Sequence, residues 1–135
     1  MDSLSQQERS NIMARVGSKN TRPELHVRKA VFSLGYRYRL HAKELPGSPD
    51  LVFRKRRKVI FVNGCFWHCH PKCALARTPK SRIDFWVPKL ENNSRRDQRN
   101  KNALKKAGWK VLIVWECQLK DMGRLMANIK KFLDA

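Results

Sequence analysis

Apolar and polar residues follow one another along this chain at the spacings of helices and short strands. Helices are expected over residues 4–16, 21–34, 88–107 and 122–133. The second helix has the clearest bounds, because Thr21 suits an N-cap and Gly35 suits the residue after a helix end. Pro23 and Glu24 fit its first turn. Its predicted buried face carries Leu25, Val27, Ala30, Val31 and Leu34.

Shorter apolar runs predict the strands. Residues 36–40 alternate aromatic and basic side chains, which indicates a half-exposed strand. Residues 50–53 and 58–62 flank a basic turn and predict a hairpin. Residues 111–115 (VLIVW) are apolar throughout, which is typical of a strand at the centre of a sheet. This order of elements predicts one mixed α/β domain over residues 1–135, with a small sheet flanked by helices.

The charge balance points to a polyanionic partner. The formal net charge is +19, from 30 Lys and Arg against 11 Asp and Glu. Such an excess destabilises a compact state by self-repulsion, and nucleic acid is the partner that most often compensates it. An anionic membrane surface or a merely solvated basic surface are the alternatives. The polar N-terminus and the absence of a long apolar run favour a cytoplasmic protein without a membrane segment.

The cysteines are the next candidates for chemistry. In a reducing compartment, closely spaced thiols are metal ligands more often than disulfides. Three of the four lie in the segment GCFWHCHPKC, and the fourth follows the strand VLIVWE. A structural Zn²⁺ site takes four Cys or His ligands in a tetrahedron. Spacing alone leaves six candidates for those four places: Cys65, His68, Cys69, His70, Cys73 and Cys117.

A carboxylate at a strand start offers a second kind of metal site. Asp50 follows Pro49 at the beginning of the predicted hairpin. Hydrolysis of a phosphodiester needs a divalent cation, and Mg²⁺ prefers oxygen ligands such as a carboxylate and a backbone carbonyl. A Pro-Asp pair is also common in a plain turn before a strand, so this feature is weak by itself.

Aromatic and basic side chains fall in segments that can face DNA. Phe66, Trp67, Phe85 and Trp86 lie in or near polar, irregular sequence, where they would either stack on bases or cap the core. The helix after residue 92 carries basic residues suited to phosphate contacts, as does the turn at residues 54–58. Either basic segment would also serve as a solvated surface. The first candidates for DNA contact are Arg95, Arg96 and Arg99.

Taken together, these segments resemble the very short patch repair (Vsr) DNA mismatch endonucleases. The resemblance runs from about residue 9 to residue 133. It rests on RSNIMARV with TRPE, LPGSPDLVF, VIFVNGCFWHCH, DFWVPKL with NSRRDQRN, and GWKVLIVWEC, in that order. It implies a restriction-endonuclease-like fold related to the PD-(D/E)xK nucleases. It also implies a Mg²⁺-dependent nick on the 5′ side of the thymine in a T:G mismatch, which arises when 5-methylcytosine deaminates.

The resemblance also assigns residues to the chemistry. Asp50 would bind Mg²⁺ together with the backbone carbonyl of Val62. His68 would take a proton from the attacking water, a role that histidine commonly fills near neutral pH. Glu24 and Asp97 match acidic residues near the family's active site, although Glu24 also suits the first turn of a helix without any catalytic role.

Zinc ligands and a DNA wedge are implied in the same way. The zinc ligands would be Cys65, His70, Cys73 and Cys117. The wedge that enters the duplex beside the mismatch would be Phe66, Trp67 and Trp86. Two departures stand out: Asn63 replaces a histidine of some members, and the spacing from His70 to Cys73 is one residue longer than in some, which leaves Cys69 as a competing ligand.

Three hypotheses follow. The first is a monomeric nicking endonuclease for T:G mismatches in double-stranded DNA, with a mismatch-repair protein and a cytosine methyltransferase as partners implied by the resemblance. The second is a nicking or restriction-associated endonuclease of the same fold with another DNA substrate. The third is a zinc-stabilised DNA-binding protein without catalysis, which would have no need for Asp50 and His68.

Overall fold

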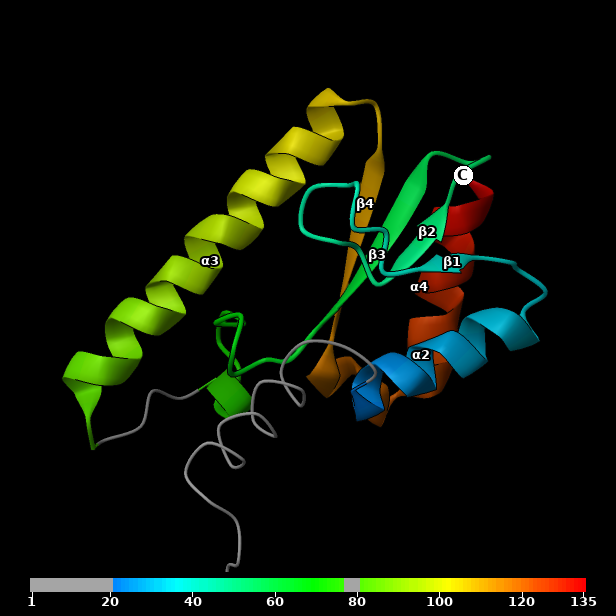
Figure 1. The fold of residues 1–135 in the computed structure, drawn as a ribbon. Helices are drawn as coiled ribbons and strands as arrows, with labels where there is room; N and C mark the ends of the chain where they lie inside the picture. The colour runs from blue at the N-terminus through cyan, green and yellow to red at the C-terminus, as the bar shows by residue number, and fades with distance from the viewer. Residues whose placement is uncertain (1–20, 77–80) are drawn as a thin grey trace, which may run out of the picture.

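Four short strands form the sheet of the computed structural model, which describes residues 21–76 and 81–135. The predicted helix at residues 4–16 lies outside these residues. The strands lie in the order β1-β2-β3-β4, with β1, β2 and β3 antiparallel and β4 parallel to β3 (Figure 1). Their bounds are Arg39–Leu40 for β1, Leu51–Phe53 for β2, Lys58–Asn63 for β3 and Lys110–Trp115 for β4.

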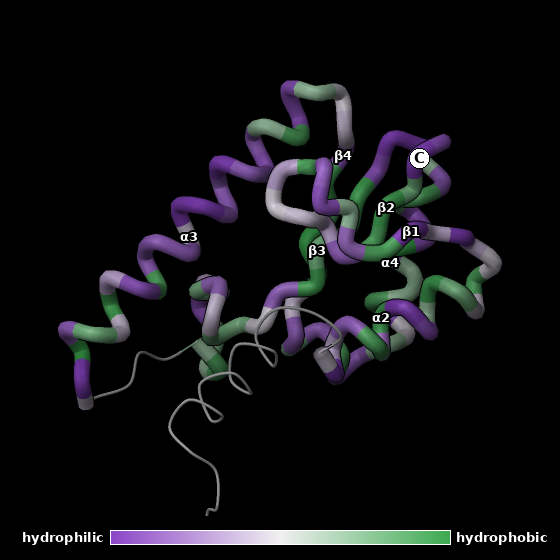
Figure 2. Tube along the Cα trace, in the orientation of Figure 1, coloured by the Kyte–Doolittle hydropathy of each residue, from purple (hydrophilic) through white to green (hydrophobic). Residues whose placement is uncertain are grey.

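Helices cover both faces of this sheet. Helices α2 and α4 pack on one face and α3 crosses the other (Figure 1). Hydrophobic side chains concentrate in the strands, whereas α3 is mostly hydrophilic (Figure 2). The described helices are α2 (Arg22–Ser33), α3 (Ile83–Lys106) and α4 (Met122–Asp134), with short 3₁₀ turns η1 (Ala74–Ala76) and η2 (Glu116–Lys120).

Alternation along the strands divides the core in two. Leu51 and Ile60 face α2 and α4, where they pack with Val31 and other buried apolar side chains. Val52 and Val59 face the opposite way and form a smaller cluster with Leu104 of α3 and Trp109. Because successive side chains of a strand point to opposite faces, β2, β3 and β4 each contribute to both clusters. The predicted mixed α/β fold is therefore confirmed.

Helix α2 begins where the sequence predicts. The Thr21 hydroxyl accepts a hydrogen bond from the Glu24 N–H at 3.4 Å, and Gly35 has a φ of +93° after the helix end. Leu25 was wrongly placed in the core, since it is 43% exposed. Glu24 and Val27 occupy the buried face instead, and Leu25 lies about 100° around the helix from Glu24.

The prediction that β4 is central is wrong. Among the described strands it lies at one edge of the sheet, next to β3 alone. Its apolar sequence reflects helices on both faces rather than strands on both sides. Leu112 and Val114 pack with the cluster under α2 and α4, while Val111 packs with the cluster under α3.

Two other bounds differ from the prediction. Helix α3 begins at Ile83, five residues before Pro88, although proline favours a first turn. The first turn of α3 is held by contacts of Phe85 and Trp86 with other aromatic rings. The strand predicted at residues 36–40 has only two paired residues.

No helix in the described ranges has the length and apolar character needed to cross a membrane.

Candidate active site

A cleft of about 1110 Å³ opens where several segments meet. These segments are the start of α2, the residues before β2, the end of β3, the loop after β3, the middle of α3, and residues of β4 and η2. The cleft is lined by acidic, aromatic and imidazole side chains that the sequence singled out: Glu24, Asp50, Phe66, Trp67, His68 and Asp97.

Asp50 lies at the start of β2, opposite the end of β3. Its Oδ2 accepts a hydrogen bond from the Val62 N–H at 2.7 Å. In a strand, the N–H and C=O of one residue point to the same edge, as exchanged pairs of ladder hydrogen bonds require. The Val62 carbonyl therefore faces the edge of β3 on which Asp50 lies. A carboxylate and a backbone carbonyl thus meet at one wall of the cleft.

Glu24 is a buried acid beside Asp50. Its side chain hydrogen-bonds Asp50, and its two oxygens lie 3.1 and 3.0 Å from Nε2 of His41. The Arg28 guanidinium, one turn along α2, also donates to Glu24. Burial alone would raise the pKa of Glu24, but the hydrogen bonds with His41 and Asp50 and the nearby positive charge lower it overall.

Asp50 has the opposite perturbation. Burial, followed by the hydrogen bond to Glu24 and the negative charge of Glu24, raises the pKa of Asp50 to about 7, although the Val62 N–H opposes this rise. The two carboxyl groups therefore share a proton near neutral pH. A divalent cation would take the place of that proton, which is the behaviour expected of a carboxylate metal ligand.

His68 and Asp97 form a pair on the far side of the cleft. Nδ1 of His68 lies 2.5 Å from Oδ2 of Asp97, in the middle of α3. An ionised carboxylate is an acceptor only, so the imidazole must carry its proton on Nδ1. The lone pair of a neutral His68 then lies on Nε2, where it can accept a proton from water.

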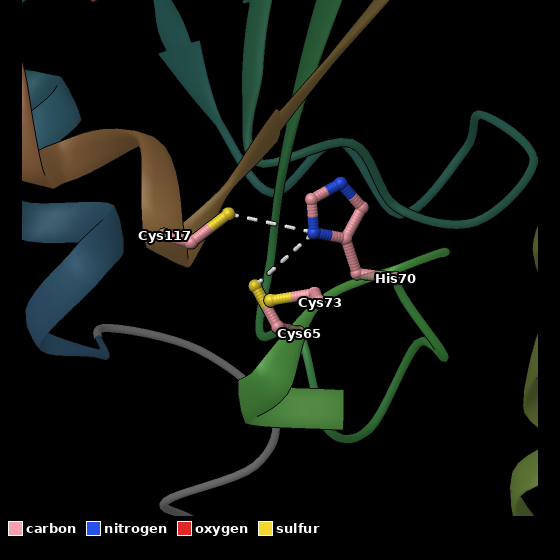
Figure 3. A group of neighbouring side chains, drawn as sticks. All are labelled: Cys65, His70, Cys73 and Cys117. Carbon is pink, nitrogen blue, oxygen red and sulfur yellow. Dashed lines mark hydrogen bonds between the residues drawn. The ribbon is translucent and has the colours of Figure 1, made fainter. Parts of the chain in front are cut away.

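The parallel register of β3 and β4 explains a cluster of metal-ligating side chains. Asn63 pairs with Trp115, so Cys65 and Cys117, each two residues further along, leave the sheet side by side. Figure 3 shows the side chains of Cys65, His70, Cys73 and Cys117 converging on one point. Their ligand atoms all lie within 4.8 Å of one another.

The spacing within this cluster matches tetrahedral zinc. The Cys65 and Cys117 sulfurs lie 3.6 and 3.4 Å from Nδ1 of His70. Zinc bonds of about 2.3 Å to sulfur and about 2.0–2.1 Å to nitrogen at tetrahedral angles place S and N about 3.5 Å apart. Burial and the neighbouring Cys117 thiol raise the pKa of Cys65 to about 12, so without a cation the Cys65 thiol stays protonated.

The two remaining candidates for the zinc ligands have other contacts. The Cys69 sulfur lies 3.5 Å from the Leu90 carbonyl of α3, and His68 is paired with Asp97. Four of the six candidate Cys and His side chains therefore lie together in the cluster, whereas Cys69 and His68 contact α3 instead. The His70 ring stacks on Trp115, with centroids 4.2 Å apart, which fixes the orientation of the ring.

The aromatic residues form a cluster of their own. Phe66, Trp67 and Trp86 contact one another, with ring centroids 5.1–5.8 Å apart, and Phe85 contacts Trp86. Within the described residues they belong to neither core cluster. The Asn93 amide donates to the Trp67 carbonyl at 3.3 Å and ties the loop to α3. The rings therefore pack on one another outside the two core clusters, and Phe66 and Trp67 line the cleft.

Helix α3 presents its basic residues outward along the same side of the sheet. The predicted phosphate contacts are exposed, whereas Lys101 is half-buried and lines the cleft. Sequence reasoning missed His41, which belongs to none of the patterns described above. Nothing in the sequence indicates its role, because its position depends on a turn with a φ of +47° after β1. The exposed residues of α3 that are predicted to contact phosphates are Arg95, Arg96 and Arg99.

Comparison with known proteins bears on this arrangement directly. The family model described as "DNA mismatch endonuclease Vsr" matches residues 1–75, more than half of the chain. The chain belongs to the Vsr family. It is therefore a DNA endonuclease, a hydrolase of a nuclease family that acts in DNA repair.

Relatives of this Vsr-family endonuclease support the assignment over nearly the full chain. "Type II nicking enzyme V.XorIIP" of Xanthomonas oryzae pv. oryzae is 53% identical over 133 residues, which cover 98% of this chain and 97% of the relative. "Type II nicking enzyme V.NmeAIP" of Neisseria meningitidis is 42% identical, covering 96% of each chain. "DNA mismatch endonuclease Vsr" of Escherichia coli is 39% identical, covering 87% of this chain and 74% of the relative.

Proposed function

We propose that this Vsr-family endonuclease nicks one DNA strand on the 5′ side of the thymine in a T:G mismatch. The reaction is Mg²⁺-dependent phosphodiester hydrolysis, and its role is repair of deaminated 5-methylcytosine. One observation carries the proposal: a single loop after β3 brings His68, Phe66 and Trp67 into the lining of the same cleft as Asp50. Hydrolysis and distortion of the duplex are thus assigned to neighbouring parts of one surface.

The chemistry of the donors fits Mg²⁺. Asp50 supplies a carboxylate and Val62 a backbone carbonyl, and both are hard oxygen ligands. The open cleft leaves room for waters and a phosphate oxygen. When bound there, Mg²⁺ would polarise the phosphate and lower the pKa of a nearby water. Glu24 would hold Asp50 in place through the hydrogen bond between their side chains.

His68 would act as the general base. Asp97 holds Nδ1–H, which leaves Nε2 to take the proton from the attacking water. The same contact stabilises the imidazolium that results, because the carboxylate lies against its charged ring. The oxygen of the water then bonds to phosphorus, the bond from phosphorus to the 3′ oxygen breaks, and the released 3′ oxygen takes a proton from solvent water. The products carry a 5′-phosphate and a 3′-hydroxyl.

Phe66, Trp67 and Trp86 would form the wedge. Aromatic side chains inserted at a base step unstack it and kink the duplex, at a cost of a few kcal/mol. A mismatched step is already weakened, so the cost there is lower. Preference for a mismatch follows from this difference. The exposed arginines of α3 would contact the phosphates alongside, which positions the duplex without reading its sequence.

Zinc would join the loop to the sheet. Cys65, His70, Cys73 and Cys117 supply a complete tetrahedral set, as a structural site requires. Because the loop also carries His68 and the wedge, the zinc would hold both in register with β3 and β4. We further propose that residues 1–135 form one domain of the restriction-endonuclease-like fold and act as a monomer, since one cleft suffices for one nick.

A second candidate function is favoured by the names of the relatives. Two of those reported above are called Type II nicking enzymes, which suggests a nickase tied to the sequence context of a restriction-modification system. This alternative keeps the catalytic cleft and changes the recognised sequence around the mismatch. A cytosine methyltransferase of the same system and a mismatch-repair protein are the partners we propose.

Single substitutions in the cleft test the proposed mechanism. Asp50→Ala and His68→Ala should each abolish Mg²⁺-dependent nicking of a T:G duplex, while affinity for that duplex without Mg²⁺ stays close to wild type. Undiminished nicking by either variant would sink the corresponding assignment. Duplexes with T:G in varied flanking sequences then separate the two candidate functions, because a restriction-associated nickase acts in one context only.

A further inference from the structure

His41 links the two acids of the cleft without lining the cleft itself. It follows β1 directly, and its backbone N–H donates to the Asp50 carbonyl at 3.3 Å, which extends the pairing of β1 with β2 by one residue. Its Nε2 lies 3.1 and 3.0 Å from the two oxygens of Glu24. One residue therefore contacts Asp50 through the main chain and Glu24 through the side chain.

This contact is held in a conformation that few residues adopt. The φ of His41 is +47°, in the left-handed region, where histidine is more frequent than most residues with a Cβ. Strained backbone of this kind persists when the surroundings hold it and is concentrated at functional sites. Because Glu24 is 2% exposed, the imidazole is a main source of hydrogen bonds for a carboxylate that has lost most of its water.

The ligand atoms of Glu24, His41 and Asp50 also lie within 4.8 Å of one another, so a direct role of the imidazole as a metal ligand is the alternative. Two contacts argue against that role. Nε2 is already directed at Glu24, and the Arg28 guanidinium lies 3.5 Å from the same nitrogen. A cation at Nε2 would meet that positive charge. His41 is also absent from the cleft lining, whereas Glu24 and Asp50 belong to it.

We infer that His41 is a positioning residue for the hydrolytic metal site, which holds the buried Glu24 carboxylate in the orientation that leaves Asp50 able to bind a divalent cation. The inference rests on the proposed function of the cleft. His41 acts only through Glu24, in the way that outer partners orient the ligands of metal sites and sustain their affinity. Without its donor, the buried Glu24 carboxylate would lose that orientation, and Asp50, which is hydrogen-bonded to Glu24, would no longer be held in place for the cation.

A matched pair of substitutions tests this role. In His41→Gln, the amide reaches about as far as Nε2 and still donates to Glu24. In His41→Leu, a side chain of similar size has no donor, and both variants share the cost of the left-handed φ. His26→Leu removes an exposed imidazole from α2 and serves as the control. Mn²⁺ binding to the zinc-loaded protein is measured by electron paramagnetic resonance without DNA, and Mg²⁺ dependence of nicking is measured separately.

His41→Leu should raise the Kd for Mn²⁺, and the Mg²⁺ concentration for half-maximal nicking, by about 10–100-fold. The zinc content of His41→Leu, and its affinity for DNA in the absence of Mg²⁺ and Mn²⁺, should stay at wild-type values. In His41→Gln, the Kd for Mn²⁺ and the Mg²⁺ concentration for half-maximal nicking should both return to near wild-type values. His26→Leu should change neither quantity. Unchanged or tighter Mn²⁺ binding by His41→Leu would overturn the inference. So would a signal of directly bound nitrogen that disappears in His41→Gln, because His41 would then be a ligand.

The same measurements distinguish failure of the proposed function from failure of the positioning role of His41. If wild-type protein shows no Mg²⁺-dependent nicking, or Asp50→Ala nicks as well as wild type, the proposed function fails. If wild type behaves as proposed and His41→Leu binds Mn²⁺ like wild type, the positioning role alone fails.

Discussion

Replacing Asp50 with asparagine should make the protein more stable while removing its activity. Asp50 is a half-buried acid beside the buried Glu24, and desolvation and Glu24 raise its pKa from 3.8 to about 7. Asparagine keeps an oxygen that can accept the Val62 N–H, and its amide can donate to Glu24. The variant therefore retains the main hydrogen bonds of the site without the second negative charge. It loses the carboxylate needed to bind Mg²⁺.

The direction of the pH effect follows from the raised pKa. A group that binds its proton more tightly in the folded protein contributes stability at low pH and loses that contribution as pH rises through its folded pKa. The rise from 3.8 to about 7 amounts to about 4 kcal/mol as an upper bound. Between pH 5 and pH 8, the wild-type protein should therefore lose about 2 kcal/mol of stability relative to Asp50→Asn.

Urea denaturation followed by tryptophan fluorescence measures this difference. Both proteins are loaded with zinc. Mg²⁺ is left out of the buffer and no chelator is added, because a chelator would also remove zinc from the Cys and His cluster. The free energy of unfolding of Asp50→Asn should exceed that of wild type at pH 8, by about 2 kcal/mol more than it does at pH 5. Glu91→Gln, which neutralises an exposed carboxylate on α3, should show no such pH-dependent difference.

Two results would refute this reasoning. In one, Asp50→Asn is no more stable than wild type at pH 8. In the other, its advantage is the same at pH 5 as at pH 8, so that removing the charge is not the cause. Retention of Mg²⁺-dependent nicking by the variant would contradict the role of Asp50 in the reaction.

Three further substitutions examine other parts of the site. Cys117→Ser should lose zinc and destabilise the domain, because binding energy at a structural zinc is folding energy; full zinc content with an unchanged thermal melt would contradict this. Trp67→Ala should reduce the ratio of nicking rates on T:G and T:A duplexes, whereas an equal loss on both would make it a packing residue. Asp97→Asn should slow nicking by about 10²-fold or more without changing the Mg²⁺ requirement; a single-turnover rate equal to wild type would exclude its action through His68.

Local sequence patterns predicted the elements that local chemistry determines. The N-cap of α2 depends on one hydroxyl, Thr21, three residues before Glu24, and the end of α2 depends on Gly35. The hairpin of β2 and β3 depends on two apolar runs and a short basic turn. Each of these is encoded within a few residues, so each can be found without knowing the rest of the fold.

The place of β4 in the sheet could not be predicted in the same way. An apolar strand is expected wherever both faces are covered, and helices cover both faces of an edge strand here. Hydrophobicity reports burial of side chains and carries no information on how many neighbours a strand has. The start of α3 was missed for a similar reason, because its first turn is held by contacts with Phe66, which is distant in sequence.

The site depends most on contacts between distant segments. The sequence offered six ligands for four places, and the register that pairs Asn63 with Trp115 is what brings Cys65 to Cys117. Cys69 leaves the set because it points to α3. His41 could not be found at all, since its contact with Glu24 spans 17 residues and requires a left-handed turn.

A strand-resolved cleavage assay with Mg²⁺ tests the central claim most directly. The substrates are a duplex with one T:G mismatch in varied contexts and its T:A counterpart, each labelled on both strands, with Asp50→Ala as the control. We predict a single nick on the 5′ side of the mismatched thymine, which requires Asp50 and is absent from the T:A duplex. Equal cleavage of both duplexes, cleavage of both strands, or a nick that survives Asp50→Ala would contradict the account.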